Sequence, residues 1–204
     1  MFGLVVRDAA LLSSETTFYG PSGVMQKSDM QYITPIPGGR SLLGLRGDQS
    51  DCRFLRSQLE AVCSEHFLNF DGRPLSCSAV ASYCRHIISK HMRSRPLAVE
   101  VLVAGWDDKA DAPMLYWLDE IGAMQQVPYA VHGGQFPFIF SVLDRSGTRG
   151  DGGPSLKDVS LQDGLEIVES CWNVVRKRSG GSLDHSLFET YAVTRSGVEK
   201  RVKE

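Results

Sequence analysis

The sequence predicts an α+β fold, a four-layer αββα sandwich in which two β-sheets face each other and each carries two helices on its outer side. Three observations lead to this fold class. Segments of strand and helix character follow one another in the order strands, two helices, strands, two helices, strands. Each of the two longest helical segments has one apolar face. The central strands are apolar on nearly both faces, which is typical of a sheet covered on both sides.

Composition limits the class of protein. With 204 residues, 42% of them apolar and 23% charged, the chain is expected to form a single domain over residues 1–204. A net charge of -2 argues against nucleic acid and anionic membrane surfaces as partners. Residues 121–143 carry no charged side chain, but their glutamines, prolines and glycines argue against a membrane span. Five cysteines, an odd number, favour reduced buried thiols in an intracellular protein over a disulfide framework.

The first strands are expected in two pairs. Residues 1–17 have the pattern of a hairpin, and a Pro/Gly turn follows at residues 18–23. Residues 30–47 have the pattern of two more strands around a turn at Pro37-Gly38-Gly39. These strands precede the first helix pair.

Two amphipathic helices come next. Apolar residues recur at the spacing of one helical face from Cys52 to Phe70, and again from Cys77 to His91. A short link between two such helices indicates a helical layer packed on a sheet. The side chains expected to accept hydrogen bonds from the first amides of the first helix are Asp48, Ser50 and Asp51.

The second half of the chain repeats this order. Residues 97–134 contain three strand-like runs separated by turns, which predicts a meander. A third helix is expected at about residues 135–144, and a fourth starts near Ser160, where Ser160 and Asp163 resemble a capping box. Two closing strands surround a turn at Ser196-Gly197.

A series of short motifs in the middle of the chain resembles the type-4 beta subunits of the 20S proteasome. The resemblance covers nearly the whole chain, strongly over residues 93–145 and weakly before residue 47, and the closing hairpin shares it. The matching elements are Arg93-Ser94-Arg95, Ala104-Gly105-Trp106-Asp107, Leu115-Tyr116-Trp117, Asp119, Pro128-Tyr129-Ala130, His132-Gly133 and Leu143-Asp144-Arg145.

The resemblance implies a fold, partners and a location. The family has the N-terminal-nucleophile hydrolase sandwich, in agreement with the layers predicted above. Its particle is a cylinder of four stacked rings in which beta subunits form the two inner rings around a proteolytic chamber. The implied partners are other beta subunits of the same ring, subunits of the alpha ring and the opposite beta ring, in the cytoplasm and nucleus. No cofactor is implied.

Active members of this family use an amino-terminal threonine as the nucleophile and its own amine as the base. Here Met1 stands at the head of the first strand, and the first threonine is Thr16. Cleavage before Thr16 or Thr17 would delete the first hairpin. The only Gly-Thr pair, Gly147-Thr148, is far downstream. The resemblance therefore predicts the family's shape without its nucleophile.

The two supporting charges of active members are also altered. Their aspartate, at the end of the second strand, is matched by Glu15, and Gln31 and Tyr32 stand near the position of their lysine. We therefore expect a non-catalytic structural subunit with no catalytic, cofactor-binding or metal-binding residue. The alternatives are an active N-terminal threonine endopeptidase subunit with a degenerate site, and a self-contained homo-oligomeric hydrolase.

Other motifs have simpler interpretations. His132-Gly133-Gly134 is similar to the oxyanion loop of lipases, but no G-x-S-x-G elbow accompanies it, so a tight turn is expected. Cys84, His86 and His91 lack paired metal-ligand spacing, and only Cys84 and His91 share the apolar face of the helix, so core residues are expected and a metal site is not. The tripeptides Arg46-Gly47-Asp48 and Arg149-Gly150-Asp151 are attributed to chance. The glycine-rich segment 146–154 is expected to be a surface insertion.

The proposed structural role predicts interfaces. Residues 19–24 and a sheet edge at Met114–Trp117 are expected to lie near neighbouring subunits, because both segments carry aromatic side chains. A groove shared with an active neighbouring beta subunit is expected to be a small-molecule (inhibitor) site.

Overall fold

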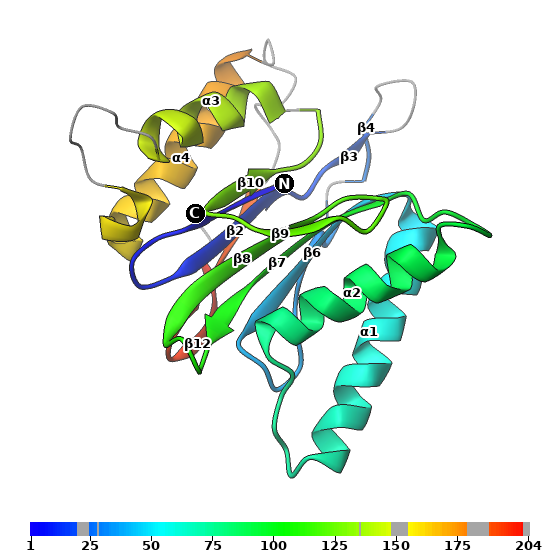
Figure 1. The fold of residues 1–204 in the computed structure, drawn as a ribbon. Helices are drawn as coiled ribbons and strands as arrows, with labels where there is room; N and C mark the ends of the chain where they lie inside the picture. The colour runs from blue at the N-terminus through cyan, green and yellow to red at the C-terminus, as the bar shows by residue number, and fades with distance from the viewer. Residues whose placement is uncertain (20–24, 28, 135, 148–154, 179–187, 202–204) are drawn as a thin grey trace.

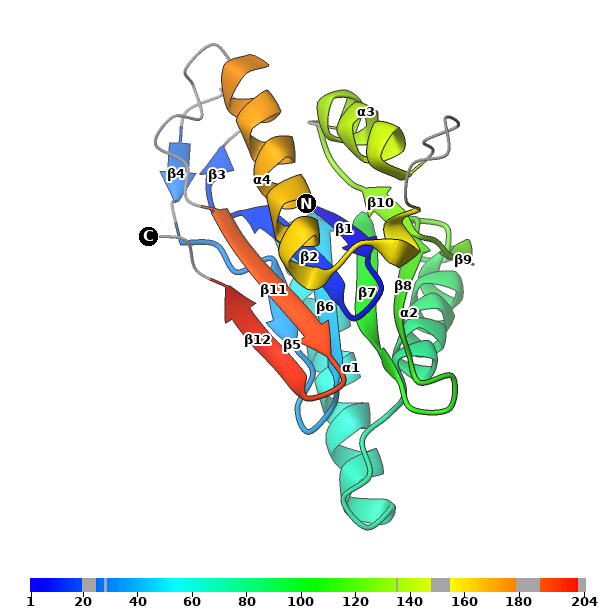
Figure 2. The same ribbon diagram turned by 90° about the vertical axis from the view of Figure 1, so that its left-hand side faces the viewer.

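The computed structural model describes residues 1–19, 25–27, 29–134, 136–147, 155–178 and 188–201. Two five-stranded antiparallel sheets lie face to face (Figures 1 and 2). Helices α1 (Gln49–Asn69) and α2 (Cys77–His91) cover the outer face of one sheet, and α3 (Phe136–Gly147) and α4 (Leu161–Arg178) cover the other. The four-layer αββα sandwich predicted from the sequence is confirmed.

The sheet under α3 and α4 contains strands from both ends of the chain. Its central strands pair so that Ser13 lies opposite Phe2 on one side and Thr190 on the other. The strand order is β10 (Tyr129–Val131), β1 (Phe2–Val5), β2 (Ala10–Glu15), β11 (Phe188–Thr194) and β12 (Gly197–Arg201).

The sheet under α1 and α2 is formed by residues from the middle of the chain. Its strand order is β5 (Ile33–Pro35), β6 (Ser41–Gly47), β7 (Val99–Asp107), β8 (Ala112–Leu118) and β9 (Met124–Gln126). A separate pair, β3 (Phe18–Tyr19) and β4 (Met25–Lys27), flanks the segment where the sequence predicts only a turn. A short 3-10 helix at Leu156–Asp158 precedes α4.

Three layers of apolar side chains hold the sandwich together. Leu55, Leu59 and Cys63 of α1 pack on the outer face of β6 and β7, together with the buried face of α2. Trp172 of α4 packs with β1 and β2 in the second layer. The third layer fills the space between the sheets and includes Met1. Alternate residues of β7 face the first and third layers, which explains why this strand is apolar on both sides.

The residues at the starts of α1 and α4 lie as predicted, except that Asp51 bonds a different segment. The carboxylate of Asp48 accepts hydrogen bonds from the amides of Ser50 and Asp51, as predicted for an N-cap. The carboxylate of Asp51 instead accepts from the amide of Ala98, at 3.0 Å, and so joins α1 to the segment before β7. Ser160 accepts from the amide of Asp163 ahead of α4.

The third run of the predicted meander is not one strand. It divides at Val127-Pro128, so that β9 belongs to one sheet and β10 to the other. Proline has no amide hydrogen to donate to a ladder. The carbonyl of Pro128 accepts from the amide of Val5, while the amide of Val127 donates to the carbonyl of Leu115. The chain crosses between the sheets at this point.

The edge predicted at Met114–Trp117 is correct at Met114 and wrong at Trp117. Trp117 pairs with Leu102 on one side and with Gln125 on the other, because β9 adds to this end of β8. Within the described residues, the first residues of β8, up to Met114, have no partner in β9 and so form an edge of the sheet. The other predicted contact segment, residues 19–24, lies outside the described residues except for the backbone of Tyr19. None of the helices in the described residues is long and apolar enough to span a bilayer.

Candidate functional site

Met1 occupies the place where a nucleophile would be expected, at the head of β1 and between the two sheets. It is 2% exposed, and its amine and carbonyl both bond the backbone of His132, at 3.3 and 2.9 Å. Gly44 makes room for its side chain, since a Cβ at that position would lie 2.6 Å from the sulfur of Met1. A thioether in this position offers no hydroxyl for attack on a peptide bond.

The amine of Met1 has lost most of its basicity. Burial lowers the pKa of this amino group from 8.0 to about 5, and the nearby positive charge of Arg46 lowers it further, against the opposing effects of Glu15 and Glu100. A neutral amine can accept a proton, as the base of an active member does. Here it has no adjacent hydroxyl on its own residue to activate.

Arg46 and Glu15 form an ion pair beside Met1. Nη2 of Arg46, on β6, lies 3.5 Å from Oε1 of Glu15, on β2, so the pair connects the two sheets. Glu15 is 6% exposed, and its second carboxylate oxygen has no hydrogen-bond partner among the described residues. Gly133 has a φ of +93°, and a Cβ on it would lie 2.5 Å from the guanidinium, so the glycine lets Arg46 pass.

Two of the residues compared with the family's site, Glu15 and Tyr32, lie in this cluster, and one charged group was not predicted. Glu15 is close enough to Met1 to affect its amine, and Tyr32 is close to both Arg46 and Glu15, with the pKa of its phenol raised by burial. Gln31 is exposed, and its carbonyl accepts a hydrogen bond from Arg56. Sequence reasoning found no cation near the lysine position and missed Arg46, which comes from the next strand.

His132 closes the other side of the site. Its Nδ1 lies 3.5 Å from Oε1 of Glu100 and its Nε2 lies 3.3 Å from the carbonyl of Val101. The imidazole stacks on the ring of Trp117 at a centroid distance of 5.9 Å. The hydrogen bond from His132 lowers the pKa of Glu100, against the effect of burial. The predicted tight turn after His132 is confirmed by the positive φ of Gly133.

Thr16 and Thr17 lie in the segment between β2 and β3. Thr17 is buried, and the carbonyl of Thr16 accepts from the amide of Met30. Gly147 ends α3, and Thr148 lies outside the described residues. The site thus contains an amine, a carboxylate and a guanidinium, and its first residue carries a thioether in place of a hydroxyl.

The other motifs are structural where they are described. Gly47 has a φ of +128°, and Asp48 caps α1, so Arg46-Gly47-Asp48 is part of the fold. Cys84 is buried and His86 exposed. In the described part of the chain no three His, Cys, Asp or Glu side chains are grouped as metal ligands would be. The second Arg-Gly-Asp tripeptide and most of segment 146–154 lie outside the described residues.

The cysteines lie as predicted, at apolar positions of helices. Cys63, Cys77, Cys84 and Cys171 are buried, Cys52 is half-buried, and all five are free thiols. Burial raises the pKa of Cys77, Cys84 and Cys171 to about 12, which keeps these thiols protonated and unreactive at neutral pH.

Comparison with known proteins points to one family. Residues 1–186 match the family model described as proteasome subunit. The chain is 28% identical to the proteasome subunit beta type-4 of Saccharomyces cerevisiae, over 87% of this chain and 85% of that protein. It is 25% identical to a probable beta type-4 subunit of Neurospora crassa, over 97% and 92%. It is 35% identical to the beta type-2 subunit of Trypanosoma brucei brucei, over 63% and 62%.

Proposed function

The chain belongs to the proteasome subunit family, and we propose that it is a non-catalytic structural beta subunit of the 20S core particle. It completes the inner beta ring and supports ubiquitin/ATP-linked intracellular protein degradation by active neighbouring subunits. The observation that carries this proposal is Met1, buried at the head of β1, where a catalytic member needs a threonine.

The surroundings of Met1 support inactivity. Active members pair their nucleophile with a lysine whose charge assists proton transfer. Here the cation is Arg46, and it is bound to Glu15 at 3.5 Å across the gap between the sheets. A guanidinium stays protonated at any physiological pH, so it cannot exchange a proton with a neighbouring hydroxyl. The charges at this site therefore serve to hold the sheets together.

The proposed partners follow from the family. They are the neighbouring beta subunits of the ring, subunits of the alpha ring and the opposite beta ring, in the cytoplasm and the nucleus. A permanent contact of this kind buries on the order of 1,000 Å² or more. A groove between this chain and an active neighbour is proposed as an inhibitor site, because pockets favour such junctions.

Native mass spectrometry of the tagged chain from its own cells tests the proposal. We expect a particle far heavier than 22.5 kDa that contains many chain types, with this chain still carrying Phe2 at or next to its start. A chain that begins at Thr16 or Thr17, and that reacts with a threonine-directed electrophile, would establish the protease alternative. A particle with one chain type would indicate the homo-oligomeric hydrolase, and a lone chain would contradict the proposal.

A further inference from the structure

The imidazole ring of His132 has an oxygen acceptor beside each of its two nitrogens. Nδ1 lies 3.5 Å from Oε1 of Glu100, and Nε2 lies 3.3 Å from the carbonyl oxygen of Val101. A neutral imidazole has one N–H, so it would donate to one of these oxygens and turn a lone pair towards the other. The imidazolium donates to both. Because the side chain is 4% exposed, water has little access to serve as the second partner.

The face of the ring also favours a positive charge. The indole of Trp117 stacks on the imidazole of His132, with the two centroids 5.9 Å apart and the planes inclined by 17°. A cation within about 6 Å of an indole ring is attracted by the negative face of its π-system. This contact therefore stabilises the protonated ring more than the neutral one.

The charges around His132 balance when its ring is protonated. At pH 7 the amine of Met1 is neutral, because burial lowers its pKa to about 5, and the phenol of Tyr32 is neutral, because burial raises its pKa. Two carboxylates and one guanidinium remain, so a positive ring gives a cluster of zero net charge. An unbalanced charge away from water is costly. The ionisable groups that make up this cluster with His132 are the Met1 amine, Glu15 on β2, Tyr32, Arg46 on β6 and Glu100 on β7.

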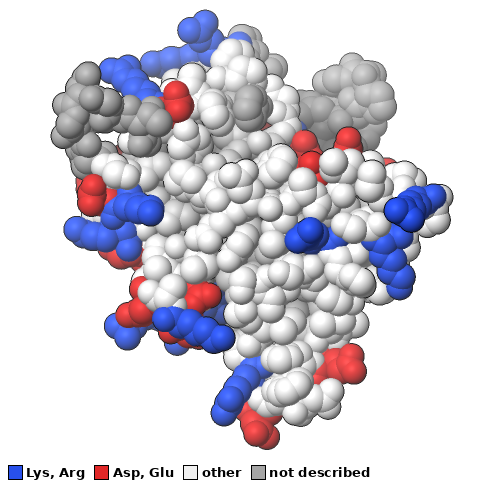
Figure 3. Space-filling model, in the orientation of Figure 1, with Lys and Arg blue, Asp and Glu red and all other residues white. Residues whose placement is uncertain are grey.

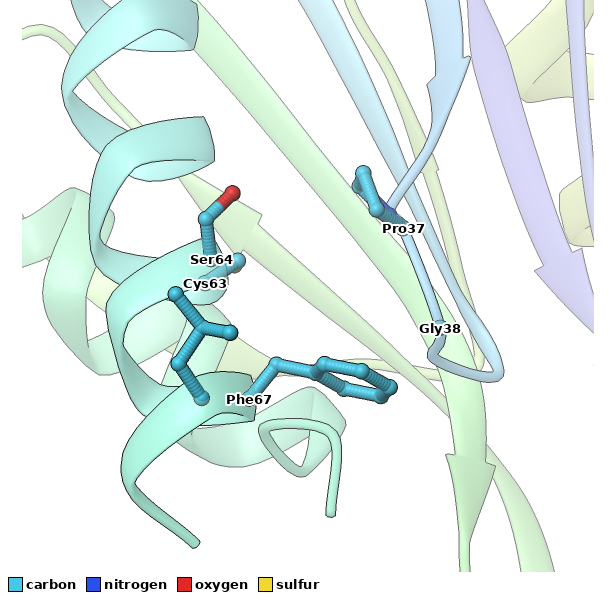
Figure 4. A pocket seen from close by; sticks show the side chains of 6 residues that line it. Pro37, Gly38, Cys63, Ser64 and Phe67 are labelled. Atoms are coloured by element: carbon cyan, nitrogen blue, oxygen red, sulfur yellow. The ribbon is translucent and has the colours of Figure 1, made fainter. Parts of the chain in front are cut away.

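This gathering of charge between the sheets differs from the surface. Over the face drawn in Figure 3, basic and acidic side chains are scattered among uncharged ones. A cavity of about 260 Å³ between α1 and the turn before β6, lined by Pro37 and Phe67 among others (Figure 4), lies at the opposite end of β6 from Arg46. It adds no space beside His132, whose partners are therefore the protein groups named above.

His132 connects three strands at the start of the chain. Its amide donates to the carbonyl of Met1 at 2.9 Å, and its carbonyl accepts from the amine of Met1 at 3.3 Å. Its backbone thus holds the residue that precedes β1 next to the end of β10. Its ring reaches Glu100 and Val101 of β7, in the other sheet. The backbone link does not depend on the charge of the ring, whereas the link to β7 does.

We propose that His132 is a buried imidazolium that connects the start of β1 to β7, and that this connection weakens when the ring loses its proton as the pH rises. The device lies within the single chain and does not depend on assembly into a particle. In the unfolded chain an ordinary imidazole loses its proton near pH 6.5, at roughly the value of model peptides. The connection therefore stabilises the fold fully below about pH 6.5, and this contribution is lost as the pH rises through the value at which the folded ring deprotonates.

Nitrogen NMR of the chain labelled in its histidines tests the protonation state. We expect both ring nitrogens of His132 to carry hydrogen at pH 7, with the exposed His86 as the internal reference. The signals of His132 are those that vanish in His132→Gln or, where that variant does not fold, those that move most in Glu100→Gln. In Glu100→Gln the ring should lose its second proton at a pH lower by about 0.5 or more. A single protonated nitrogen at pH 7, or a titration that Glu100→Gln leaves unchanged, would overturn the proposal.

Hydrogen exchange tests the connection itself. After correction for the intrinsic effect of pH on exchange, protection of the His132 amide should fall about threefold or more between pH 6 and pH 9. The amide of Val127, which donates to the carbonyl of Leu115 at 3.0 Å, is the reference and should keep its protection. Glu100→Gln should make the fall at His132 smaller. Constant protection at His132, or an equal fall at both amides, would contradict a connection controlled by this ring.

Discussion

Arg46 and Glu15 connect the two sheets at the head of the first strand, with Nη2 of the guanidinium 3.5 Å from Oε1 of the carboxylate. Thirty-one positions separate them in the sequence, and they belong to strands of different sheets. The side chain of Glu15 is 8% exposed and that of Arg46 27%. The carboxylate has therefore lost most of its hydration and depends on the guanidinium for compensation.

Arg46→Met should destabilise the chain by about 1–3 kcal/mol, because it leaves the buried carboxylate of Glu15 without its partner. The estimate is below the cost of breaking a fully buried pair, since Arg46 is partly exposed. Adding Glu15→Gln to Arg46→Met should restore part of the loss, because the remaining group is then neutral. Chemical denaturation of the purified chain measures both differences.

Arg40→Met is the matched control. Nη1 of Arg40 lies 2.8 Å from Oδ1 of Asp108, which is a shorter contact, but the two side chains are 42% and 74% exposed. Removing an exposed pair should change stability by at most about 1 kcal/mol. If Arg40→Met cost more than Arg46→Met, burial would not be what makes the Arg46 pair important.

Glu100 should make a small, pH-dependent contribution to stability. The hydrogen bond from His132 lowers the pKa of Glu100 below its ordinary value of 4.5. A carboxyl group whose folded-state pKa is lowered stabilises the fold above the ordinary value, and this contribution is lost as pH falls through the folded-state pKa. Because Glu100 is partly exposed, Glu100→Gln should cost less than about 1 kcal/mol at pH 7, and progressively less as the pH falls below the ordinary value of 4.5.

Parallel denaturation curves of the wild-type chain and of Glu100→Gln between pH 3 and pH 7 give this difference. Glu60→Gln, on an exposed part of α1, is the control and should show almost no difference at either pH. If the stability difference between the wild-type chain and Glu100→Gln grew as the pH fell, the sign assigned to the interaction with His132 would be wrong.

The layers of the fold could be predicted from the sequence because they depend on local periodicity. Leu55, Leu59 and Cys63 follow helical spacing, and all three are buried as that spacing implies. The same pattern continues to Phe67 and Phe70, which are exposed. Periodicity identifies the apolar face of a helix but carries no information on where the supporting sheet ends.

The site was predicted less completely, because its geometry depends on contacts between distant residues. The absence of a threonine at the head of β1 is visible in the sequence. The replacement cation is not, since the approach of Arg46 to Glu15 requires the two sheets to be stacked. A charged residue in an otherwise apolar strand was the available signal. Likewise, Trp117 was placed at an edge because the pairing of β9 with β8 could not be inferred from local pattern.

Gly47→Ala should be strongly destabilising. Gly47 has a φ of +128°, and an added Cβ would lie 2.0 Å from the carbonyl oxygen of Ala98, which is backbone and cannot move aside cheaply. We expect a loss of about 4 kcal/mol or failure to fold. Gly134→Ala is the control, because nothing lies within 4 Å of its added Cβ and its φ is not positive. Gly134→Ala should change the free energy of unfolding by no more than about 0.5 kcal/mol. Thermal unfolding that gave similar stabilities for Gly47→Ala and Gly134→Ala would contradict this account.

Ser13 and Trp172 should be energetically coupled. The indole Nε1 of Trp172 donates to Oγ of Ser13 at 2.8 Å, in a buried contact between α4 and β2. Ser13→Ala leaves that indole donor unpaired, at a cost of about 1–3 kcal/mol. Trp172→Phe removes the donor together with part of a ring that stacks on Phe188, so it is destabilising in its own right. In the double variant no indole donor remains to lose its partner. The total loss in free energy of unfolding should therefore be smaller than the sum of the two single losses by about 1 kcal/mol.

Ser14→Ala is the control for this cycle: its hydroxyl donates to the carbonyl of Glu15, so its effect should add to that of Trp172→Phe. Coupling as large for Ser14 as for Ser13 would show that the cycle reports general loosening of β2 and not the hydrogen bond.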